Sequence, residues 1–367
     1  MTQPLAPPIR VLVVDDSAYM RHIISRSLNE APGLRVVGAA RDGREALEQI
    51  STLEPDVVTL DVEMPRLDGL AALREIMAHS PRPVIMLSTF TRKGAHETVQ
   101  ALMWGAVDFV AKPAARANVA VVMEEVVAKV RAAAAARRLQ PAFGAAPLPR
   151  ENTTQPAAPE RSPALRRARP ARKVVVIGAS TGGPRALTLV LAGLPPNLDA
   201  AVLVVQHMPA GFTRSLAERL NTVSAIPIKE AEAGDDLGAG LGLVAPGGFH
   251  LTLDEASRIA LTTSPPVHGV RPAVDVTMTA AARQFGAAAV GVVLTGMGSD
   301  GTHGAALIRA AGGRVIAEHE STCVVWGMPR SVVEAGFADL IAPLPEVAGA
   351  IESLVGLEQP RQTAEAE

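Results

Sequence analysis

Three side chains that together could hydrolyse an ester or an amide occur at similar positions in the second half of the chain. Ser180, His207 and Asp300 each follow an apolar run rich in β-branched residues, which is typical of a buried strand. The runs cover 174–177, 200–205 and 288–294. The carboxyl ends of parallel strands lie at one edge of a sheet, so we expect the three side chains to meet there. A hydroxyl, an imidazole and a carboxylate in contact act as nucleophile, general base and orienting group.

The turn around Ser180 has the spacing of a nucleophile elbow. The segment 178–182 reads Gly-Ala-Ser-Thr-Gly, and Pro184 is well placed in the first turn of a following helix. A serine at this corner lies beside the N–H groups of a helix N-terminus, which can hold a developing negative charge. The spacing also suits a glycine turn that binds a phosphate or a dinucleotide, and the motif alone leaves both interpretations open.

The base and the carboxylate also have alternatives. Asp300 could serve only to cap the helix expected from about residue 302. Other histidines of the second half compete with His207 for the role of base. They are His250, His268, His303 and His319, of which His303 is expected to face solvent from a helix start.

A second set of polar residues lies at expected strand ends in the first half of the chain. These residues are Asp15, Asp16, Asp61, Ser88 and Lys112. Three carboxylates at one edge of a sheet would repel each other unless a cation joined them, and carboxylate oxygens suit Mg²⁺. A lysine there could neutralise a transferred phosphoryl group. Taken singly, the aspartates could be helix caps and the lysine a solvated surface residue, but the joint placement of all five favours a site.

Strands and helices alternate strictly along the first half, which predicts a doubly wound parallel sheet. We expect strands at 9–14, 34–40, 56–60, 83–87 and 107–110, and helices at 18–28, 44–51, 70–77, 95–103 and 118–139. The second half adds a strand at 314–317, short strands near 228 and 242, a hairpin over 249–253 and 258–262, and helices at 184–191, 212–221, 274–285, 302–311 and 329–334. The fold class is therefore α/β, with two domains that each have a mostly parallel sheet, flavodoxin-like first and Rossmann-like second.

Composition limits the classes of protein that the chain can belong to. It has 367 residues, 48% of them apolar, a net charge of −2 and only 3% aromatic residues. Neither the charge nor the aromatic content favours nucleic-acid binding. One cysteine, Cys323, excludes an internal disulfide, and the sequence shows no signal peptide and no apolar run long enough for a bilayer. We expect a cytoplasmic protein with no direct membrane insertion.

The composition changes between the two expected domains. We expect a first domain over 8–130, a flexible Ala/Pro/Arg-rich linker over 131–171, a catalytic domain over 172–357 and a tail over 358–367. The basic residues near the end of the linker are typical of a solvated tether, and a docking role for them is the less favoured interpretation.

The first domain resembles response-regulator receiver domains. The resemblance rests on VVDDS at 13–17, LDVEMPRLDG at 60–69 and VDFVAKP at 107–113. It implies that Asp61 accepts a phosphoryl group from a histidine kinase. It also implies that Mg²⁺ is held by Asp15, Asp16, Asp61 and the carbonyl of Glu63, and that Ser88 and Lys112 contact the phosphoryl oxygens.

The second domain resembles the catalytic domain of the chemotaxis protein-glutamate methylesterases. The resemblance rests on GASTGG at 178–183, QHMPAGFT at 206–213, LTGMGSDG at 294–301 and CVVWGMP at 323–329. It implies that Ser180 is the nucleophile, His207 the general base and Asp300 the orienting carboxylate. Backbone N–H groups of Thr181 and Met297 would surround the oxyanion. The segment RPAVD at 271–275 is also similar to the family and is expected to help bind the substrate backbone.

The resemblance implies a function for the whole arrangement. The enzyme would hydrolyse glutamate γ-methyl esters on methylated chemoreceptors at the membrane, release methanol, and deamidate certain receptor glutamines. No metal is expected in the esterase chemistry. The receiver is expected to cover the catalytic cleft until Asp61 is phosphorylated. The particular receptors and kinase, and the oligomeric state, do not follow from the sequence.

Three rival functions remain at this stage. A transcription regulator would carry a short helical DNA-binding module after the receiver, whereas this second half is a long α/β pattern. A nucleotide-dependent oxidoreductase would want a second glycine where Ser180 stands, although Asp199 falls at the spacing of a ribose-binding acid. The same esterase chemistry could serve a signalling array other than chemotaxis.

Overall fold

The computed structural model describes residues 7–89, 91–112, 119–137 and 169–356. It divides into two units, each with its own sheet and core. Among the described helices, none combines the length and the apolar character that a membrane crossing requires.

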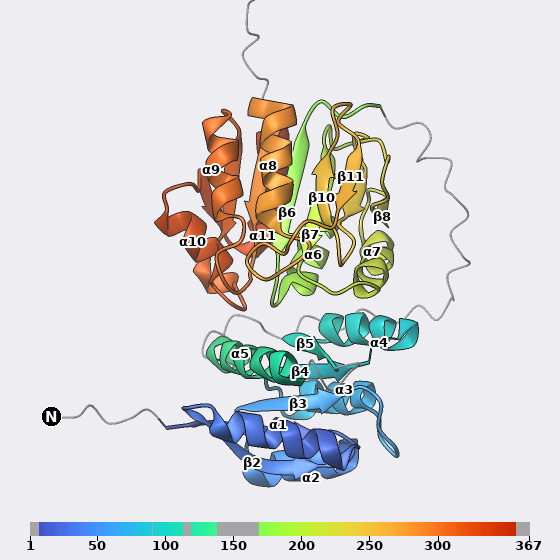
Figure 1. Ribbon diagram of the computed structural model, residues 1–367, viewed down its shortest axis with the longest axis vertical. Helices are drawn as coiled ribbons and strands as arrows, with labels where there is room; N and C mark the ends of the chain where they lie inside the picture. The colour runs from blue at the N-terminus through green and yellow to red at the C-terminus, as the bar shows by residue number, and fades with distance from the viewer. Residues whose placement is uncertain (1–6, 90, 113–118, 138–168, 357–367) are drawn as a thin grey trace, which may run out of the picture. The chain divides into compact units, whose positions relative to one another are not determined.

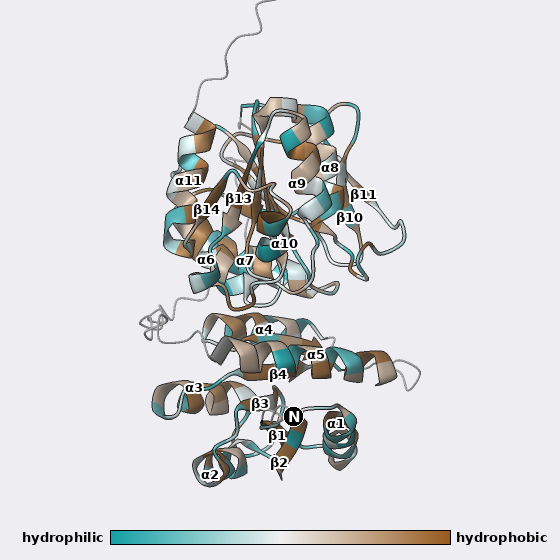
Figure 2. Ribbon diagram, turned by 90° about the vertical axis from the view of Figure 1, so that its left-hand side faces the viewer, coloured by the Kyte–Doolittle hydropathy of each residue, from teal (hydrophilic) through white to brown (hydrophobic). Residues whose placement is uncertain are grey.

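The first unit is a five-stranded parallel sheet with the order β2-β1-β3-β4-β5. Its strands are β1 (Ile9–Val14), β2 (Leu34–Ala40), β3 (Val57–Asp61), β4 (Val84–Ser88) and β5 (Asp108–Ala111). Its helices are α1 (Ala18–Glu30), α2 (Gly43–Leu53), α3 (Gly69–His79), α4 (Arg92–Met103) and α5 (Val119–Arg137). Helices α1 and α5 cover one face of the sheet, and α2, α3 and α4 cover the other (Figures 1 and 2). Strands β3, β4 and β5, and β1 from Val11 on, are buried on both faces, which explains their apolar sequences, whereas the edge strand β2 is only partly buried.

The second unit is a seven-stranded sheet with the order β14-β13-β12-β6-β7-β9-β8, and every pair in it is parallel. Its strands are β6 (Val174–Ala179), β7 (Ala201–Gln206), β8 (Ile228–Glu230), β9 (Gly242–Val244), β12 (Ala289–Val293), β13 (Arg314–Glu318) and β14 (Leu340–Ala342). A separate antiparallel hairpin consists of β10 (His250–Leu253) and β11 (Ile259–Thr262).

Helices cover both faces of this second sheet. They are α6 (Gly183–Ala192), α7 (Phe212–Val223), α8 (Val274–Phe285), α9 (Thr302–Ala310), α10 (Met328–Glu334) and α11 (Leu344–Gly356). Helices α6, α7 and α11 lie on one face, and α8 and α9 lie on the other with the hairpin beside α8 (Figure 2). The chain winds outward from β6 in both directions, because β7 lies on one side of it and β12 on the other. In such sheets ligands bind at the carboxyl end of the strands where the winding reverses.

The predicted fold class of two doubly wound, mostly parallel α/β domains is confirmed. Two elements were not assigned from the sequence, β14 and α11. Residues 131–137 fall both in the helix expected over 118–139 and in the linker expected over 131–171, and they form the last turns of α5. They form an alanine-rich stretch, and alanine has the highest helix propensity. The remaining expected linker up to residue 168, and the expected tail, lie outside the described residues.

Helix α8 packs closely against the carboxyl end of β6 because Gly178 has no side chain. A Cβ added there would lie 2.5 Å from Cγ1 of Val274, the first residue of α8. Real Cβ atoms do not approach a neighbour so closely, so a larger residue would push α8 away from the sheet. The position of α8 is important for the site described below.

We predict that Gly178→Ala destabilises the second unit by about 1–3 kcal/mol, because the added methyl group overpacks the interface between β6 and α8. Urea unfolding followed by circular dichroism measures the change. Gly349→Ala is the matched control: it lies in α11 with open space around it, and it should be neutral or stabilise by about 0.5–1 kcal/mol. Equal stability of the Gly178 variant and the wild type would contradict this account of the packing.

Candidate functional site

Ser180 and His207 leave neighbouring strands at the same level of the sheet. Ala179 of β6 pairs with Gln206 of β7, and the His207 N–H donates to the Ala179 carbonyl at 3.1 Å. Ser180 and His207 are the residues that follow this pair, at the carboxyl ends of two adjacent strands. Ser180 is half-buried and the His207 side chain is 10% exposed. Gln206 Nε2 donates to the backbone carbonyls of both residues, so the two turns adjoin at the carboxyl ends of β6 and β7.

Asp300 reaches His207 from the other side of β6. Its Oδ2 lies 2.8 Å from His207 Nε2, across 93 positions of sequence. Asp300 stands in the loop between β12 and α9 and is 1% exposed. The structure therefore joins two of the three predicted side chains by a direct hydrogen bond and places the third at the end of the strand next to that of His207. No hydrogen bond of the Ser180 hydroxyl is recorded among the described residues.

The Asp300 carboxylate accepts hydrogen bonds from backbone as well as from His207. Oδ2 accepts from Val274 N–H at 2.7 Å, and Oδ1 accepts from Asp275 and Gly301 N–H at 2.9 Å. Burial opposes the ionisation of Asp300, but His207 and these N–H groups outweigh it and hold its pKa below the ordinary value. The residue is therefore an ionised carboxylate, which keeps the proton of His207 on Nε2.

Two loops meet around Ser180. A Cβ added to Gly296 would lie 2.7 Å from Ser180 Cβ, so the backbone of the loop after β12 packs directly on the serine. Thr295 joins the loops: its carbonyl accepts from Ser180 N–H at 3.0 Å, and its Oγ1 donates to the Thr181 carbonyl at 3.0 Å. Thr181 and Met297, the residues expected to supply oxyanion N–H groups, lie on these two loops, next to Ser180 and to Gly296 respectively.

Two further polar residues support these loops and were missed from the sequence. Gln206 is 2% exposed, and its Nε2 donates to the Ser180 carbonyl at 2.9 Å and to the His207 carbonyl at 3.3 Å. Glu318 at the end of β13 is fully buried, and its Oε2 accepts from Thr295 N–H at 2.8 Å. In the sequence, each of them is a polar residue at the end of an apolar strand, and the same pattern identified His207.

The competing histidines have other positions. His250 is buried, where its Nδ1 accepts from Ala273 N–H and its Nε2 faces the Pro265 carbonyl. His303 lies in the first turn of α9 and is exposed, as expected. His319 is also exposed. His268 pairs with Asp275 and is considered below. Arg271, in the segment expected to help bind the substrate backbone, donates through Nη1 to the carbonyls of Thr263 and Ser264.

The first unit brings Asp15, Asp61 and Lys112 together at the carboxyl ends of β1, β3 and β5. Lys112 Nζ lies 2.8 Å from Asp15 Oδ2 and 2.7 Å from Asp61 Oδ2. The pKa of Asp61 is raised to about 6, because burial and the charges of Asp15 and Asp16 together outweigh the lowering effect of Lys112. Burial opposes the charge of Lys112, but the two carboxylates outweigh that effect and raise its pKa. The lysine therefore stays charged between them.

The acidic residues of this edge fit a divalent cation. Asp15, Asp16 and Asp61 each offer an oxygen, and these ligand atoms lie within 4.8 Å of one another. Hard carboxylate oxygens are the donors that Mg²⁺ prefers. Asp16 and Glu63 also line a cavity of about 600 Å³ at the start of the loop after β3. The Ser88 hydroxyl lies at the end of β4 and donates to the Gly94 carbonyl at 3.2 Å.

Comparisons with known proteins match both units. Residues 11–124 match the response regulator receiver domain, and residues 175–351 match the CheB methylesterase family. The chain is 54% identical to a protein-glutamate methylesterase/protein-glutamine glutaminase of Symbiobacterium thermophilum, over 97% of this chain and 99% of that protein. A protein of the same name from Geobacillus kaustophilus is 48% identical over 95% of this chain and 99% of its own length. The crystal structure of the Thermotoga maritima CheB methylesterase catalytic domain is 47% identical, with a TM-score of 0.49, covering 50% of this chain and 98% of that one.

We predict that the Asp61 carboxyl titrates near pH 6 in the protein without added cations, well above an ordinary aspartate. Carbon-detected NMR of the carboxyl group measures it. Lys112→Met should raise the midpoint further because it removes the charge that favours the carboxylate, and added Mg²⁺ should lower it for the opposite reason. Arg26→Met, which removes an exposed cation from α1, is the control and should leave the midpoint unchanged. A midpoint near 4 in the wild type would contradict the assigned burial of Asp61.

Proposed function

The chain belongs to the family of protein-glutamate methylesterases/protein-glutamine glutaminases, and from that membership we propose that Ser180, His207 and Asp300 are its catalytic triad. The activity of the family is the hydrolysis of glutamate methyl esters and the deamidation of glutamines in proteins. The observation that carries the proposal is the buried hydrogen bond between His207 and Asp300 beside Ser180 at the reversal point of the sheet.

The geometry assigns a separate role to each nitrogen of His207. Nε2 carries the proton that it donates to Asp300, so Nδ1 is the nitrogen left to accept the Ser180 proton. The Ser180 oxygen then attacks the ester carbonyl carbon, and the imidazolium returns the proton to methanol as it leaves. Water attacks the acyl-serine, His207 again accepts the proton, and the glutamate carboxylate is released. For a glutamine substrate, the leaving group is ammonia.

The negative charge of the tetrahedral intermediate needs hydrogen-bond donors. We assign this role to the backbone N–H groups of Thr181 and Met297. This assignment is supported by the hydrogen bond from Thr295 to the Thr181 carbonyl, which joins the two loops, and by the packing of Gly296 on Ser180. Loops held this way need little reorganisation when the charge develops. Removal of one such donor in serine hydrolases lowers turnover on the order of 10²-fold or more.

The first unit is a receiver domain, and we propose that Asp61 is its phosphoacceptor and that phosphorylation controls the esterase. Asp15, Asp16, Asp61 and the Glu63 carbonyl would hold Mg²⁺, which when bound neutralises phosphoryl oxygens. Lys112 is already charged beside Asp61 and would contact the transferred group, as would Ser88. The partners would be a histidine kinase and methylated chemoreceptors, with the enzyme on the cytoplasmic side of the membrane.

We predict that Ser180→Ala lowers the rate of methanol release from methylated receptor by at least about 10⁴-fold, because no other hydroxyl can form the acyl intermediate. Gas chromatography of methanol measures the rate. Phosphorylation of Asp61 by a small phosphodonor should be unaffected. Ser353→Ala, on α11, is the matched serine control and should keep the wild-type rate. A Ser180 variant with near-normal turnover would exclude the triad.

We further predict that a small phosphodonor raises methanol release by the wild type and has no effect on Asp61→Asn, which lacks the acceptor oxygen. Deletion of residues 1–140 should raise the basal rate and abolish the response, because we expect the unphosphorylated receiver to restrain the enzyme. Asp56→Asn, also in the first unit, is the control and should respond like the wild type. A response that survives in Asp61→Asn, or a truncated enzyme with a lower rate, would contradict this regulation.

A further inference from the structure

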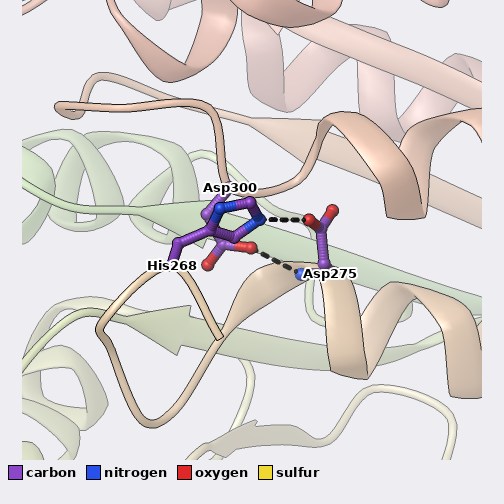
Figure 3. A group of neighbouring side chains, drawn as sticks. All are labelled: His268, Asp275 and Asp300. Carbon is purple, nitrogen blue, oxygen red and sulfur yellow. Dashed lines mark hydrogen bonds and ion pairs between the residues drawn. The ribbon is translucent and has the colours of Figure 1, made fainter. Parts of the chain in front are cut away.

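Outside the proposed triad, His268 and Asp275 form a second hydrogen-bonded pair of an imidazole and a carboxylate, and Asp275 contacts Asp300. His268 Nε2 is 2.8 Å from Asp275 Oδ2, and the Asp275 backbone N–H donates to Asp300 (Figure 3). We propose that Asp275, supported by His268, is a positioning residue that holds Asp300 in the orientation that His207 requires. The inference rests on the triad proposed above and adds two residues to the machinery of the reaction.

Asp275 and Asp300 cap each other's helices. Helix α8 has no cap from its own N-cap side chain; Asp300 accepts from the N–H groups of its first two residues, Val274 and Asp275. Helix α9 begins after Gly301 and likewise lacks a side-chain cap from its own N-cap residue. Asp275 Oδ1 accepts from Gly301 N–H at 2.9 Å and from Gly304 N–H at 2.7 Å. A change at Asp275 therefore acts on Gly301, the residue next to Asp300, and on the start of α8, which Asp300 caps.

Because Asp275 and Asp300 cap each other's helices, two buried carboxylates lie close together. Asp300 is 1% exposed and Asp275 is 4% exposed, and both accept from the same N–H group of Gly301. Like charges at this distance repel unless each is compensated. Asp300 has His207 as its partner, and Asp275 has His268. The second imidazole thus gives Asp275 a donor of its own and leaves His207 to Asp300.

The backbone at His268 is specialised for this contact. His268 and Gly269 have φ of 53° and 76°, and Val267 and Val270 exchange two backbone hydrogen bonds around them. A two-residue turn with positive φ at both positions favours asparagine, aspartate or glycine at the first of them. A histidine is uncommon there, and here its ring reaches Asp275. The turn and the side chain together indicate that the His268–Asp275 contact is a built feature of the fold.

A metal site is the alternative for the same residues. His268, Asp275 and Asp300 offer ligand atoms within 4.8 Å of one another, and His268 and Asp275 line a cavity of about 840 Å³. However, all four carboxylate oxygens already accept hydrogen bonds, and His268 Nε2 is engaged with Asp275. A cation would have to displace these bonds, including those that hold Asp300. The arrangement therefore favours a positioning network.

The experiment compares three substitutions in the full-length enzyme with methylated receptor as substrate. Asp275→Ala removes the acceptor for Gly301 and Gly304, and we expect kcat to fall on the order of 10- to 100-fold with KM little changed, because the triad is misplaced. Asp275→Asn keeps an oxygen for both N–H groups and should recover most of kcat. His268→Asn suits the turn but is too short to reach Asp275, and it should lower kcat several-fold.

A spectroscopic readout separates positioning from folding. The proton on His207 Nε2, bonded to Asp300, should give a downfield NMR signal that persists in Asp275→Asn and is lost or shifted in Asp275→Ala. Asp254→Ala is the matched control: this exposed aspartate accepts two backbone N–H groups in the β10–β11 turn, and its loss should change neither kcat nor the signal. The signal is independent of turnover, so it tests the inference even if the wild type released no methanol and the proposed function failed.

Three results would overturn the proposal. The first is a folded Asp275→Ala enzyme with wild-type kcat and an unchanged His207 signal. If Asp275→Ala does not fold, the second result is a His268→Asn enzyme with wild-type kcat. The third is loss of activity on chelation that Zn²⁺ restores in the wild type and not in His268→Asn, which would assign the cluster to a metal.

Discussion

The buried carboxylate of Asp300 is the constraint on which the second unit depends. A carboxylate that is 1% exposed is strongly destabilising unless hydrogen bonds compensate its charge. Here it accepts from His207 and from three backbone N–H groups, two of which begin α8. The same bonds that stabilise the charge fix α8 against β6 and aim the carboxylate at the imidazole. Stability and the geometry of the proposed triad therefore have one physical origin in this unit.

The two units treat a strand-end carboxylate in opposite ways. In the second unit, the N–H groups and His207 hold the pKa of Asp300 below its ordinary value, which keeps a permanent negative charge beside the imidazole. In the first unit, burial and neighbouring acids raise the pKa of Asp61 to about 6, and Lys112 compensates only part of the effect. A carboxylate surrounded by other acids favours binding of a cation. A carboxylate whose charge is already compensated by N–H groups favours a hydrogen bond from a neutral imidazole. The proposed roles of the two aspartates follow from this difference.

The loops around Ser180 show how a strand-end site is made rigid. Thr295 forms hydrogen bonds that join the loops after β6 and β12. Gln206 donates to the carbonyls of Ser180 and His207, and Glu318 accepts from the Thr295 N–H group. Each of these polar side chains is buried, so each bond replaces a contact with water that the site excludes. The glycines at 178 and 296 permit the close approach of α8 and of the loop after β12. A serine hydrolase needs this preorganisation because the charge of the intermediate develops faster than loops can rearrange.

The order and type of nearly all elements could be predicted from the sequence, because apolar β-branched runs, helical spacing and glycine or proline turns are local signals. They also placed Asp61, Ser180, His207 and Asp300 at the ends of parallel strands, or in the loop after one, where such residues share an edge. The exceptions are β14 and α11, which were not assigned from the sequence. Tertiary structure decided which imidazole pairs with Asp300 and which ring nitrogen it uses, since that bond joins residues 93 positions apart. It also decided the exchange of caps between Asp275 and Asp300, because only packing of α8 beside α9 brings one helix's carboxylate to the other's free N–H groups.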